Sequence, residues 1–284
     1  MTLSFRFGTV GSPIETPKKP GGSVGAIQFS KSIGLAALEL GWVQAVRVTE
    51  ATCAAIKSTA SEQGIAVSVH APSFINLNAG DEEWPKSRKR LMDAGHYGYL
   101  AGATDIVFHP GSYFGNDPAE VLKVAIPRLK GCVDELKKNG DKVVLRPETM
   151  GKSAMLGSFE DAIAMSNEIE GVQPCLDFAH LHARPGDGTM NTYEEWSRLL
   201  EVYKKAGGAR ALKQLHIHLS GIQYGPKGEK HHLPFAEADL DLKALFRALK
   251  EFDCGGRILC ESPILEKDAL NMKKVWMKVS GEKE

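Results

Sequence analysis

The stretch IAVSVHAPSFINLNAGDEEWPKSRKRLMDAGHYGYLAGATDIVFHPGS, residues 65–112, contains one unit of a pattern that repeats along the chain. It begins with the apolar run 65–72, continues through 81–103, where apolar positions recur with helical spacing, and ends with the apolar run 105–112. The two runs are short and rich in Val and Ile, which is typical of buried strands. The order strand, helix, strand predicts two parallel strands joined by a helical crossover.

The same alternation extends in both directions along the chain. Strands are predicted at 4–10, 35–43, 65–72, 105–112, 142–148, 172–180, 212–219 and 257–263. Helices are predicted between and after them, at 23–34, 49–64, 81–103, 118–140, 157–171, 193–208, 241–256 and 266–276. Eight strand-plus-helix units favour an α/β fold of the closed (β/α)8 TIM-barrel type, as a single domain over residues 1–284.

Composition excludes several classes of protein. With 43% hydrophobic and 25% charged residues, the chain of 284 residues can form a full core. A formal net charge of +0 gives no global positive field, which leaves only local patches for nucleic acid. The five cysteines form no CxxC pair, as in proteins of a reducing compartment. Neither a signal peptide nor an apolar run of membrane-spanning length is found, so we expect a cytoplasmic monomer without membrane contact.

Metal-ligating residue types close six consecutive predicted strands. In a barrel of parallel strands, the reactive residues lie at the carboxyl ends of the strands. One histidine at a strand end is more often a hydrogen-bonded core residue, but six such residues in succession indicate a metal site. The six are His70, His109, Glu148, Asp177, His218 and Glu261.

The run QLHIHLSG, residues 214–221, contains two histidines that strand geometry places on the same face. Taken alone, such a pair is more often hydrogen-bonded core than metal ligand. His218 lies nearer the carboxyl end of the strand and is the predicted ligand. His216 is expected one layer lower, as core or as a hydrogen-bonded support for a ligand above it.

Two further groups lie beside this end of the predicted barrel. His180 follows Asp177 by three residues, and the loop GEKHHLPF, residues 228–235, contains Glu229, His231 and His232. Charged loop residues are usually only solvated. Because this loop follows the strand of His218, we predict ligation by Glu229 and His231, with His232 pointing elsewhere. His96 and His182 are assigned to surface or helix positions.

These motifs resemble a known family. HAPSFINL, VFHPGS, RPETMG, CLDFAH, HLSG, EKHH and CES look like the ordered metal motifs of endonuclease IV, the second family of apurinic/apyrimidinic endonucleases. That family belongs to the xylose-isomerase-like barrels, and the resemblance runs from about residue 65 to the end. It implies hydrolysis of the DNA phosphodiester 5′ to an abasic site, with damaged double-stranded DNA as the partner. Zinc ions in such enzymes activate water and neutralise the phosphate.

The resemblance also implies a ligand set for three zinc ions, with manganese possible in part. His70 and His109 would bind the first ion, which Glu148 would bridge to the second. The remaining ligands are Asp177, His218 and Glu261 for the second ion and His180, Glu229 and His231 for the third. Glu148 and Glu261 are the residues expected to be catalytic.

The chain departs from the family at several of these positions. The family has aspartate where Glu229 stands, DTCH where this chain has DFAH, and HLND where it has HLSG. A tyrosine–leucine pair that enters DNA in the family is replaced by Ser73–Phe74. Phe74 is either a wedge that stacks on bases or a buried loop aromatic. The expected phosphate contacts, each of which could equally be a solvated charge, are Lys18, Lys19, Arg47, Lys152, Arg184, Lys227 and Lys230.

A divalent-metal-dependent sugar or sugar-phosphate isomerase or epimerase is the competing interpretation. Such enzymes hold one ion with a quartet that this chain also contains, namely Glu148, Asp177, His218 and Glu261. The quartet therefore does not discriminate. The surplus of His70, His109, Glu229 and His231 favours the nuclease. A non-catalytic metal-dependent binding protein is a third class, for which the sequence offers no positive feature.

Overall fold

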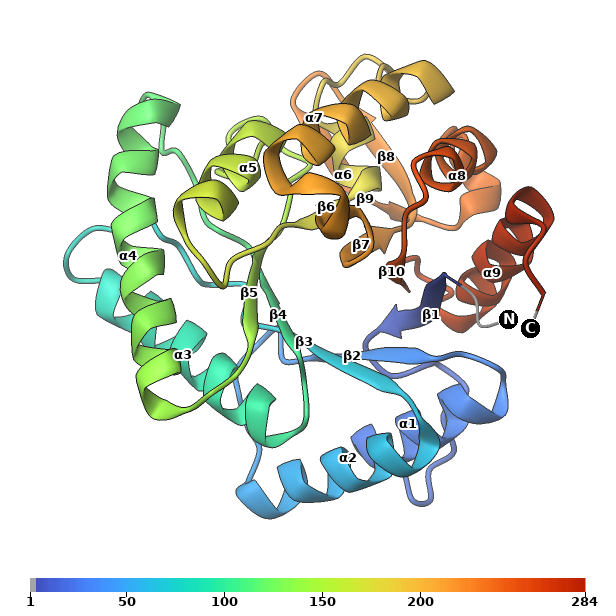
Figure 1. Ribbon diagram of the computed structural model, residues 1–284. Coiled ribbons are helices and arrows are strands. Elements are labelled where there is room, and N and C mark those ends of the chain that lie inside the picture. The colour runs from blue at the N-terminus through green and yellow to red at the C-terminus, as the bar shows by residue number, and fades with distance from the viewer. Residues whose placement is uncertain (1–3, 284) are drawn as a thin grey trace.

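The computed structural model describes residues 4–283, in which parallel strands form a ring enclosed by helices (Figure 1). The predicted (β/α)8 barrel is confirmed, although residues 1–3 and 284 of the expected domain lie outside the described part of the chain. The strands of the ring are β1 Phe5–Val10, β2 Ala37–Gly41, β3 Ala66–His70, β4 Asp105–Phe108, β5 Val144–Pro147, β6 Cys175–Asp177, β7 Leu215–Leu219 and β10 Gly256–Cys260. Their order in the sheet is β5-β4-β3-β2-β1-β10-β7-β6.

The ring closes between β5 and β6 through isolated bridges rather than a continuous ladder. The backbone N–H groups of Leu145 and Thr149 donate to the carbonyl oxygens of Gly171 and Cys175, at 3.1 and 3.0 Å. Pro147 lies between these two donors and has no N–H, so the middle hydrogen bond of the seam cannot form. The weakest part of the ring is therefore next to Glu148 and Asp177.

The helices begin and end with sequence signals that match the predicted segments. Capping boxes at Ser158/Asp161 and Thr192 start α5 and α7, while Gly64 and Gly140 end α2 and α4 in the left-handed conformation. The helices are α1 Gly22–Ser32, α2 Glu50–Gln63, α3 Trp84–Leu100, α4 Pro118–Asn139, α5 Phe159–Glu168, α6 Phe178–Ala183, α7 Tyr193–Leu212, α8 Leu242–Glu251 and α9 Glu266–Ser280. None of the helices among these described residues combines the length and apolar character needed to cross a bilayer.

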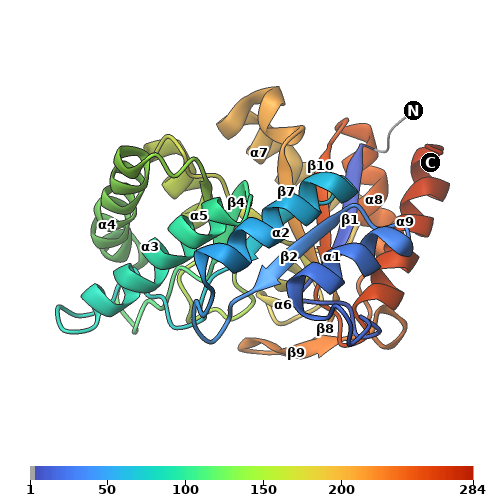
Figure 2. The ribbon, with the colours of Figure 1, turned by 90° about the horizontal axis from the view of Figure 1, so that it is seen from below.

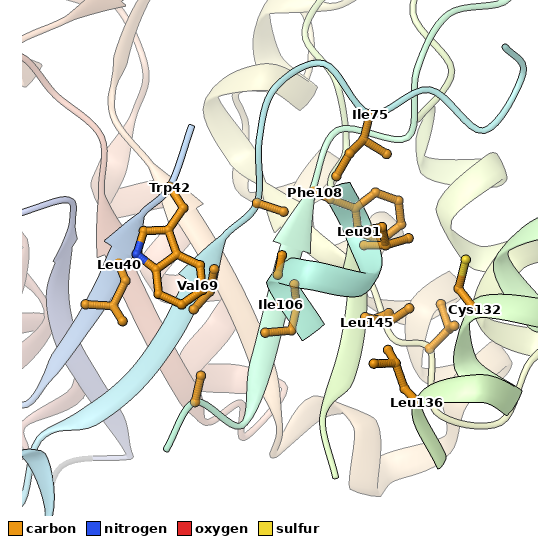
Figure 3. Close-up of a cluster of buried hydrophobic side chains, with 14 of the residues drawn as sticks. Leu40, Trp42, Val69, Ile75, Leu91, Ile106, Phe108, Cys132, Leu136 and Leu145 are labelled. Atoms are coloured by element: carbon orange, nitrogen blue, oxygen red, sulfur yellow. The ribbon is translucent and has the colours of Figure 1, made fainter. Parts of the chain in front are cut away.

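The apolar core lies between the strands and the surrounding helices. Figure 3 shows part of it, where Ile106 and Leu145 on neighbouring strands face Leu91 of α3 and Leu136 of α4. Each of these side chains is at most 2% exposed. Truncating one such side chain to alanine costs roughly 2–5 kcal/mol. This outer layer therefore supplies the stability that allows the inside of the ring to be polar.

The interior of the ring holds buried ionisable groups where barrels usually hold branched apolar residues. Toward the amino ends of the strands, Oδ1 of Asp105 accepts one hydrogen bond from Nε of Arg146 at 2.6 Å, and Oδ2 pairs with Arg257 at 2.9 Å. Further along the strands toward their carboxyl ends lie Glu39, Ser68, His70, Glu148, His216 and His218, all at most 3% exposed. Such groups need partners, because an unpaired buried charge is costly. The ionisable side chains inside the ring therefore lie next to one another as acidic and basic partners.

Two features were not predicted. Residues 178–180, expected to end the sixth strand, instead begin α6, because Oδ1 of Asp177 accepts from the backbone N–H of His180 at 2.7 Å and caps that helix. The segment after β7, expected to be a loop, contains the antiparallel hairpin of β8 Gly221–Gly225 and β9 Gly228–Leu233. Figure 2 shows this hairpin across the end of the barrel opposite both termini, which is the carboxyl end of the strands. A 3-10 turn, η1 Phe235–Glu237, follows it. The hairpin places the side chains of Glu229 and His232 against His180 of α6.

Candidate metal centre

Glu148 lies at the centre of the polar cluster at the carboxyl end of the barrel. It directly follows β5 and is fully buried. Its Oε2 lies 3.3 Å from Nε2 of His70 and 3.2 Å from Nε2 of His109. Its Oε1 lies 3.3 Å from Nδ1 of His218 and 3.4 Å from Nδ1 of His180. Both carboxylate oxygens thus face imidazole nitrogens, which is the arrangement needed to bridge two cations.

The first group of potential ligands is His70, His109 and Glu148, whose ligand atoms lie within 4.8 Å of one another. Nδ1 of His70 lies 2.9 Å from the carbonyl oxygen of Ala71. Because a carbonyl oxygen only accepts, Nδ1 carries the hydrogen in neutral His70 and the lone pair of Nε2 faces Glu148. Nε2 of His70 and Oε2 of Glu148 therefore need a proton or a cation between them. Burial lowers the pKa of His70, but the hydrogen bond and charge of Glu148 outweigh it and raise the pKa to about 9.

The second group is Glu148, Asp177, His218 and Glu261, again with ligand atoms within 4.8 Å of one another. Nδ1 of His218 lies 3.4 Å from Oε1 of Glu261. Oδ2 of Asp177 is buried and makes no hydrogen bond, which is uncommon for a buried carboxylate oxygen. Burial raises the pKa of Asp177 to about 6, against the opposing charge of His180. Three carboxylates at one place fit a bound cation.

The third group is Asp177, His180 and His232. Nδ1 of His180 contacts the carbonyl oxygen of Thr149 at 3.0 Å, and Nδ1 of His232 contacts that of Glu261 at 3.1 Å. Both Nδ1 atoms therefore donate when the rings are neutral, and the two Nε2 lone pairs face each other at 3.3 Å. Two acceptor nitrogens at this separation repel unless a proton or a cation lies between them.

Glu229 belongs beside the third group, and His231 does not. Oε2 of Glu229 lies 3.5 Å from Nε2 of His180. His231, which we predicted as a ligand, is exposed on β9, and its neighbour His232 faces the cluster instead. Adjacent strand residues point to opposite faces, and the register shift between Gln223 and Tyr224 makes Lys230 an extra residue of β9, so that Glu229 and His232 share the face toward the cluster and His231 does not. The segment was expected to be a loop, where no such rule selects between the two histidines.

Gly151 allows the hairpin to approach the strand ends. A Cβ atom at this position would lie 2.7 Å from Cβ of Glu229 and 2.9 Å from Cδ2 of His180. The backbone N–H of Glu229 also donates to the carbonyl oxygen of Gly151, at 2.9 Å. Only glycine fits between the two chains here.

Glu39 is a buried residue of the cluster that was not predicted from the sequence. It lies in β2, with Oε2 2.9 Å from Nε2 of His216 and Oε1 2.9 Å from Nε2 of His218. Burial raises the pKa of Glu39, but the charges and hydrogen bonds of the two histidines outweigh it and hold the pKa well below its usual value. A single carboxylate in the middle of an apolar strand was the signal. His216 itself lies one layer below His218, and burial lowers its pKa to about 4.

The residues expected to contact DNA are exposed, with one exception. Phe74 is 60% exposed in the loop after β3, which excludes the alternative of a buried aromatic. Of the predicted phosphate contacts, those that are exposed are Lys18, Lys19, Arg47, Lys152, Lys227 and Lys230. Arg184 instead donates to backbone carbonyl oxygens, those of Met150 and Lys152 at 2.9 and 2.8 Å. Its guanidinium therefore makes hydrogen bonds to the loop after β5.

The remaining histidines are held in hydrogen bonds away from the cluster. His182 is fully buried in α6, with Nε2 3.0 Å from Oδ1 of Asp239. His96 lies in α3 and contacts Oδ1 of Asp141 through Nδ1 at 3.1 Å. Neither belongs to any of the three groups of potential ligands.

The barrel, with metal-ligating side chains on the carboxyl ends of its strands, defines the class of this protein. Residues 27–278 match the family described as xylose isomerase-like TIM barrel, and the chain belongs to that family. The chain is 34% identical over 271 residues to an uncharacterized protein of Methanocaldococcus jannaschii, covering 95% of this chain and 96% of that protein.

The relatives also include named nucleases. The chain is 30% identical over 176 residues to a probable endonuclease 4 of Oceanobacillus iheyensis, a match that spans 57% of this chain and 54% of that protein. The resemblance inferred from the motifs is thus confirmed, at the distance of a divergent member.

Two solved structures share the fold along nearly the whole chain. The structure of endonuclease IV from Thermus thermophilus superposes with a TM-score of 0.71 and 21% identity, covering 98% of this chain and 100% of that one. A D-tagatose 3-epimerase-like protein superposes with a TM-score of 0.74 and 17% identity, covering 98% of each chain. At such identities the superpositions establish the barrel fold, while the chemistry must be argued from the site.

Proposed function

We propose that the protein is a metal-dependent phosphodiesterase that incises double-stranded DNA 5′ to abasic sites. The observation that carries this proposal is the surplus of potential ligands around Glu148. A single-ion enzyme needs only the second group. Here His70 and His109 contact one oxygen of Glu148, and His180, Glu229 and His232 extend the cluster on the other side. Three adjoining groups suit several ions and a phosphate ester.

The donor sets favour zinc in two or three positions. Imidazole-rich sets such as the first and third groups suit zinc, while the carboxylate-rich second group also suits manganese. Bound ions of this kind lower the pKa of water and neutralise phosphate charge. For its part, the chain supplies Glu148 as the bridging carboxylate and Glu261 as the acid of β10 that faces His218.

The rim of the same end supports DNA as the substrate. Four of the large hydrophobic side chains that are exposed in the described residues lie on the successive loops after β1 to β4, namely Ile14, Val43, Phe74 and Phe114. Aromatic and aliphatic side chains in such positions can stack on bases or enter an abasic gap. Exposed Lys18, Lys19, Arg47 and Lys230 can contact phosphates. The five buried, unpaired cysteines fit action in the cytoplasm, and we propose a monomer.

Cleavage of a labelled duplex with one tetrahydrofuran abasic analogue tests the proposal. This analogue resists β-elimination, so strand cleavage reports hydrolysis. Zinc-loaded protein should incise 5′ to the analogue, and Glu148→Gln or Glu261→Gln should reduce the rate by orders of magnitude, because an amide is a poor ligand and a poor bridge. Asp187→Asn, on the exposed surface, is the matched control and should leave the rate unchanged. Intact duplex after incubation with the zinc-loaded wild type would reject the nuclease.

A sugar or sugar-phosphate epimerase is the second candidate. The quartet of Glu148, Asp177, His218 and Glu261 is a sufficient site for one divalent ion, and D-tagatose 3-epimerase-like protein is among the similar folds. If the protein interconverts a ketose with its epimer in the presence of manganese and leaves the duplex intact, this candidate is correct. His70→Ala separates the two candidates, since it should abolish incision but leave epimerisation through the quartet largely intact.

A further inference from the structure

Glu39 receives three polar contacts inside the barrel. Its Oε2 accepts a hydrogen bond from Oγ of Ser68 at 2.7 Å and lies 2.9 Å from Nε2 of His216. Its Oε1 lies 2.9 Å from Nε2 of His218. Glu39 is on β2, Ser68 on β3 and both histidines on β7, so side chains from three strands meet at one carboxylate. Neither Glu39 nor its partners contact solvent to more than 1%.

One ring nitrogen of His218 faces Glu39, and the other faces the second group of potential ligands. Nε2 faces Oε1 of Glu39, while Nδ1 faces oxygens of Glu148 and Glu261 at 3.3 and 3.4 Å. A neutral imidazole carries hydrogen on one nitrogen and a lone pair on the other. With hydrogen on Nε2, the polar N–H lies against the Glu39 carboxylate at 2.9 Å, a favourable contact although it is not aligned as a hydrogen bond, and the Nδ1 lone pair faces the carboxylates of the second group. With hydrogen on Nδ1, the lone pair of Nε2 would face the Glu39 carboxylate, which is repulsive.

We propose that Glu39 is a positioning residue of the metal centre, which fixes the tautomer and the ring orientation of His218 so that Nδ1 faces a bound cation. Ser68 and His216 hold the carboxylate in place from the adjoining strands. A metal-ligating histidine that donates its other N–H to a carboxylate is a stronger and better oriented ligand. This inference rests on the proposed metal site but not on the choice between DNA and sugar as substrate.

A different role for Glu39 would be direct ligation of a deeper ion. Cys175, His216 and His218 also have ligand atoms within 4.8 Å of one another. Two ligand atoms at about 2.1 Å from one tetrahedral zinc lie roughly 3.4 Å apart. The two contacts of Glu39 at 2.9 Å are shorter than that and have the length of hydrogen bonds. The observed distances therefore favour positioning over ligation.

Zinc binding by Glu39 variants, measured without substrate, tests this role. Zinc affinity is measured by competition with a chelator, and stoichiometry is measured as the metal content at saturation. We expect Glu39→Ala to weaken one zinc site about 10–100-fold with unchanged stoichiometry at saturation. Glu39→Gln keeps one acceptor oxygen for Nε2 of His218 and should lose less. Ser68→Ala, the mildest change, removes one hydrogen bond to Glu39 and should cause the smallest loss of affinity.

Asp105→Asn is the matched control, because Asp105 is a buried acid of the same barrel that pairs with Arg146 toward the amino ends of the strands. It should lower stability without changing zinc affinity. Cobalt in place of zinc gives a second measurement, since its absorption spectrum should change in Glu39→Gln and not in Asp105→Asn. Wild-type zinc affinity in all folded Glu39 and Ser68 variants would overturn the inference, as would loss of a whole ion at saturation. A wild type that binds no zinc would overturn the metal site as well, whereas zinc binding without DNA incision would reject only the nuclease.

Discussion

At the scale of single residues, the orientation of β9 determines whether His231 or His232 belongs to the third group of potential ligands. His232 faces His180, with 3.3 Å between the two Nε2 atoms, while His231 is exposed. We expect His232→Ala to reduce zinc content by up to one ion per protein and to slow the reaction at least tenfold, because it removes a nitrogen ligand. His231→Ala should change neither by more than twofold. Elemental analysis of both purified variants checks this, and equal loss from the two would contradict the observed orientation of β9.

A substitution at Gly151 tests the third group without removing a potential ligand. The methyl group of Gly151→Ala would come within 2.7 Å of Cβ of Glu229, so the hairpin must move away from His180. We expect weaker binding of one zinc ion, with the first group unaffected. Gly131→Ala in α4 is the control, because its Cβ would meet nothing within 4 Å, and it should raise the free energy of unfolding by up to about 1 kcal/mol. Unchanged zinc affinity in Gly151→Ala would show that the approach of the hairpin is not required.

At the scale of elements, the β8–β9 hairpin pairs with the loop after β5 through the backbones of Gly151, Lys152, Gly228 and Glu229. Arg184, the residue after α6, holds that loop in place. Its guanidinium donates to carbonyl oxygens of Met150, Lys152 and Met155 at 2.9, 2.8 and 3.0 Å. Arg184→Gln removes these donors, although the carbonyl oxygen of Lys152 still accepts from the backbone N–H of Met155 at 3.0 Å, and we expect a loss of about 1–3 kcal/mol in the free energy of unfolding, measured with urea. If this variant instead keeps its stability and loses DNA affinity, the guanidinium is a phosphate contact, as the sequence had suggested.

The sequence predicts elements well where a repeated rule applies and poorly where it does not. The residues His70, His109, Glu148 and Glu261 were found because each one ends or directly follows a strand of a regular alternation. The hairpin was missed because GPKGEKHH is polar and rich in turn residues, and because β9 also pairs with the loop that contains Gly151, a contact between segments far apart in the sequence.

Glu39 was missed for a different reason. It lies in the interior of β2, where the sequence offers one carboxylate among apolar residues and no spacing that links it to histidines far along the chain. Its partners His216 and His218 come from β7, and only closure of the barrel brings these strands within contact of the same carboxylate. Pairing across the interior of a barrel depends on strand stagger, which a single sequence does not specify.

At the scale of the whole molecule, an apolar outer layer encloses a polar interior, so the free energy of folding depends on how the interior charges are satisfied. Without metal, bound protons must offset the negative charge of the buried carboxylates. His70, His180 and His218 all have pKa values raised above that of a free histidine, since nearby carboxylates outweigh the effect of burial. Metal ions would take the place of these protons, so that metal binding releases protons.

The stability of the chelated protein should therefore fall in alkaline solution. A histidine whose pKa rises on folding stabilises the fold fully below its unfolded pKa, about 6.5, and this contribution is lost as the pH rises through the folded pKa, about 9 for His70. Asp177 does not add to this window, because its pKa of about 6 lies below it. Urea denaturation with a chelator should show a loss on the order of 1–3 kcal/mol between these two pH values. With zinc bound, the same ligands are already deprotonated, so zinc should remove most of this loss, and its apparent affinity should rise with pH over the same interval. Stability of the chelated protein that is constant or increases from pH 6.5 to 9 would mean that protons do not hold the cluster together when metal is absent.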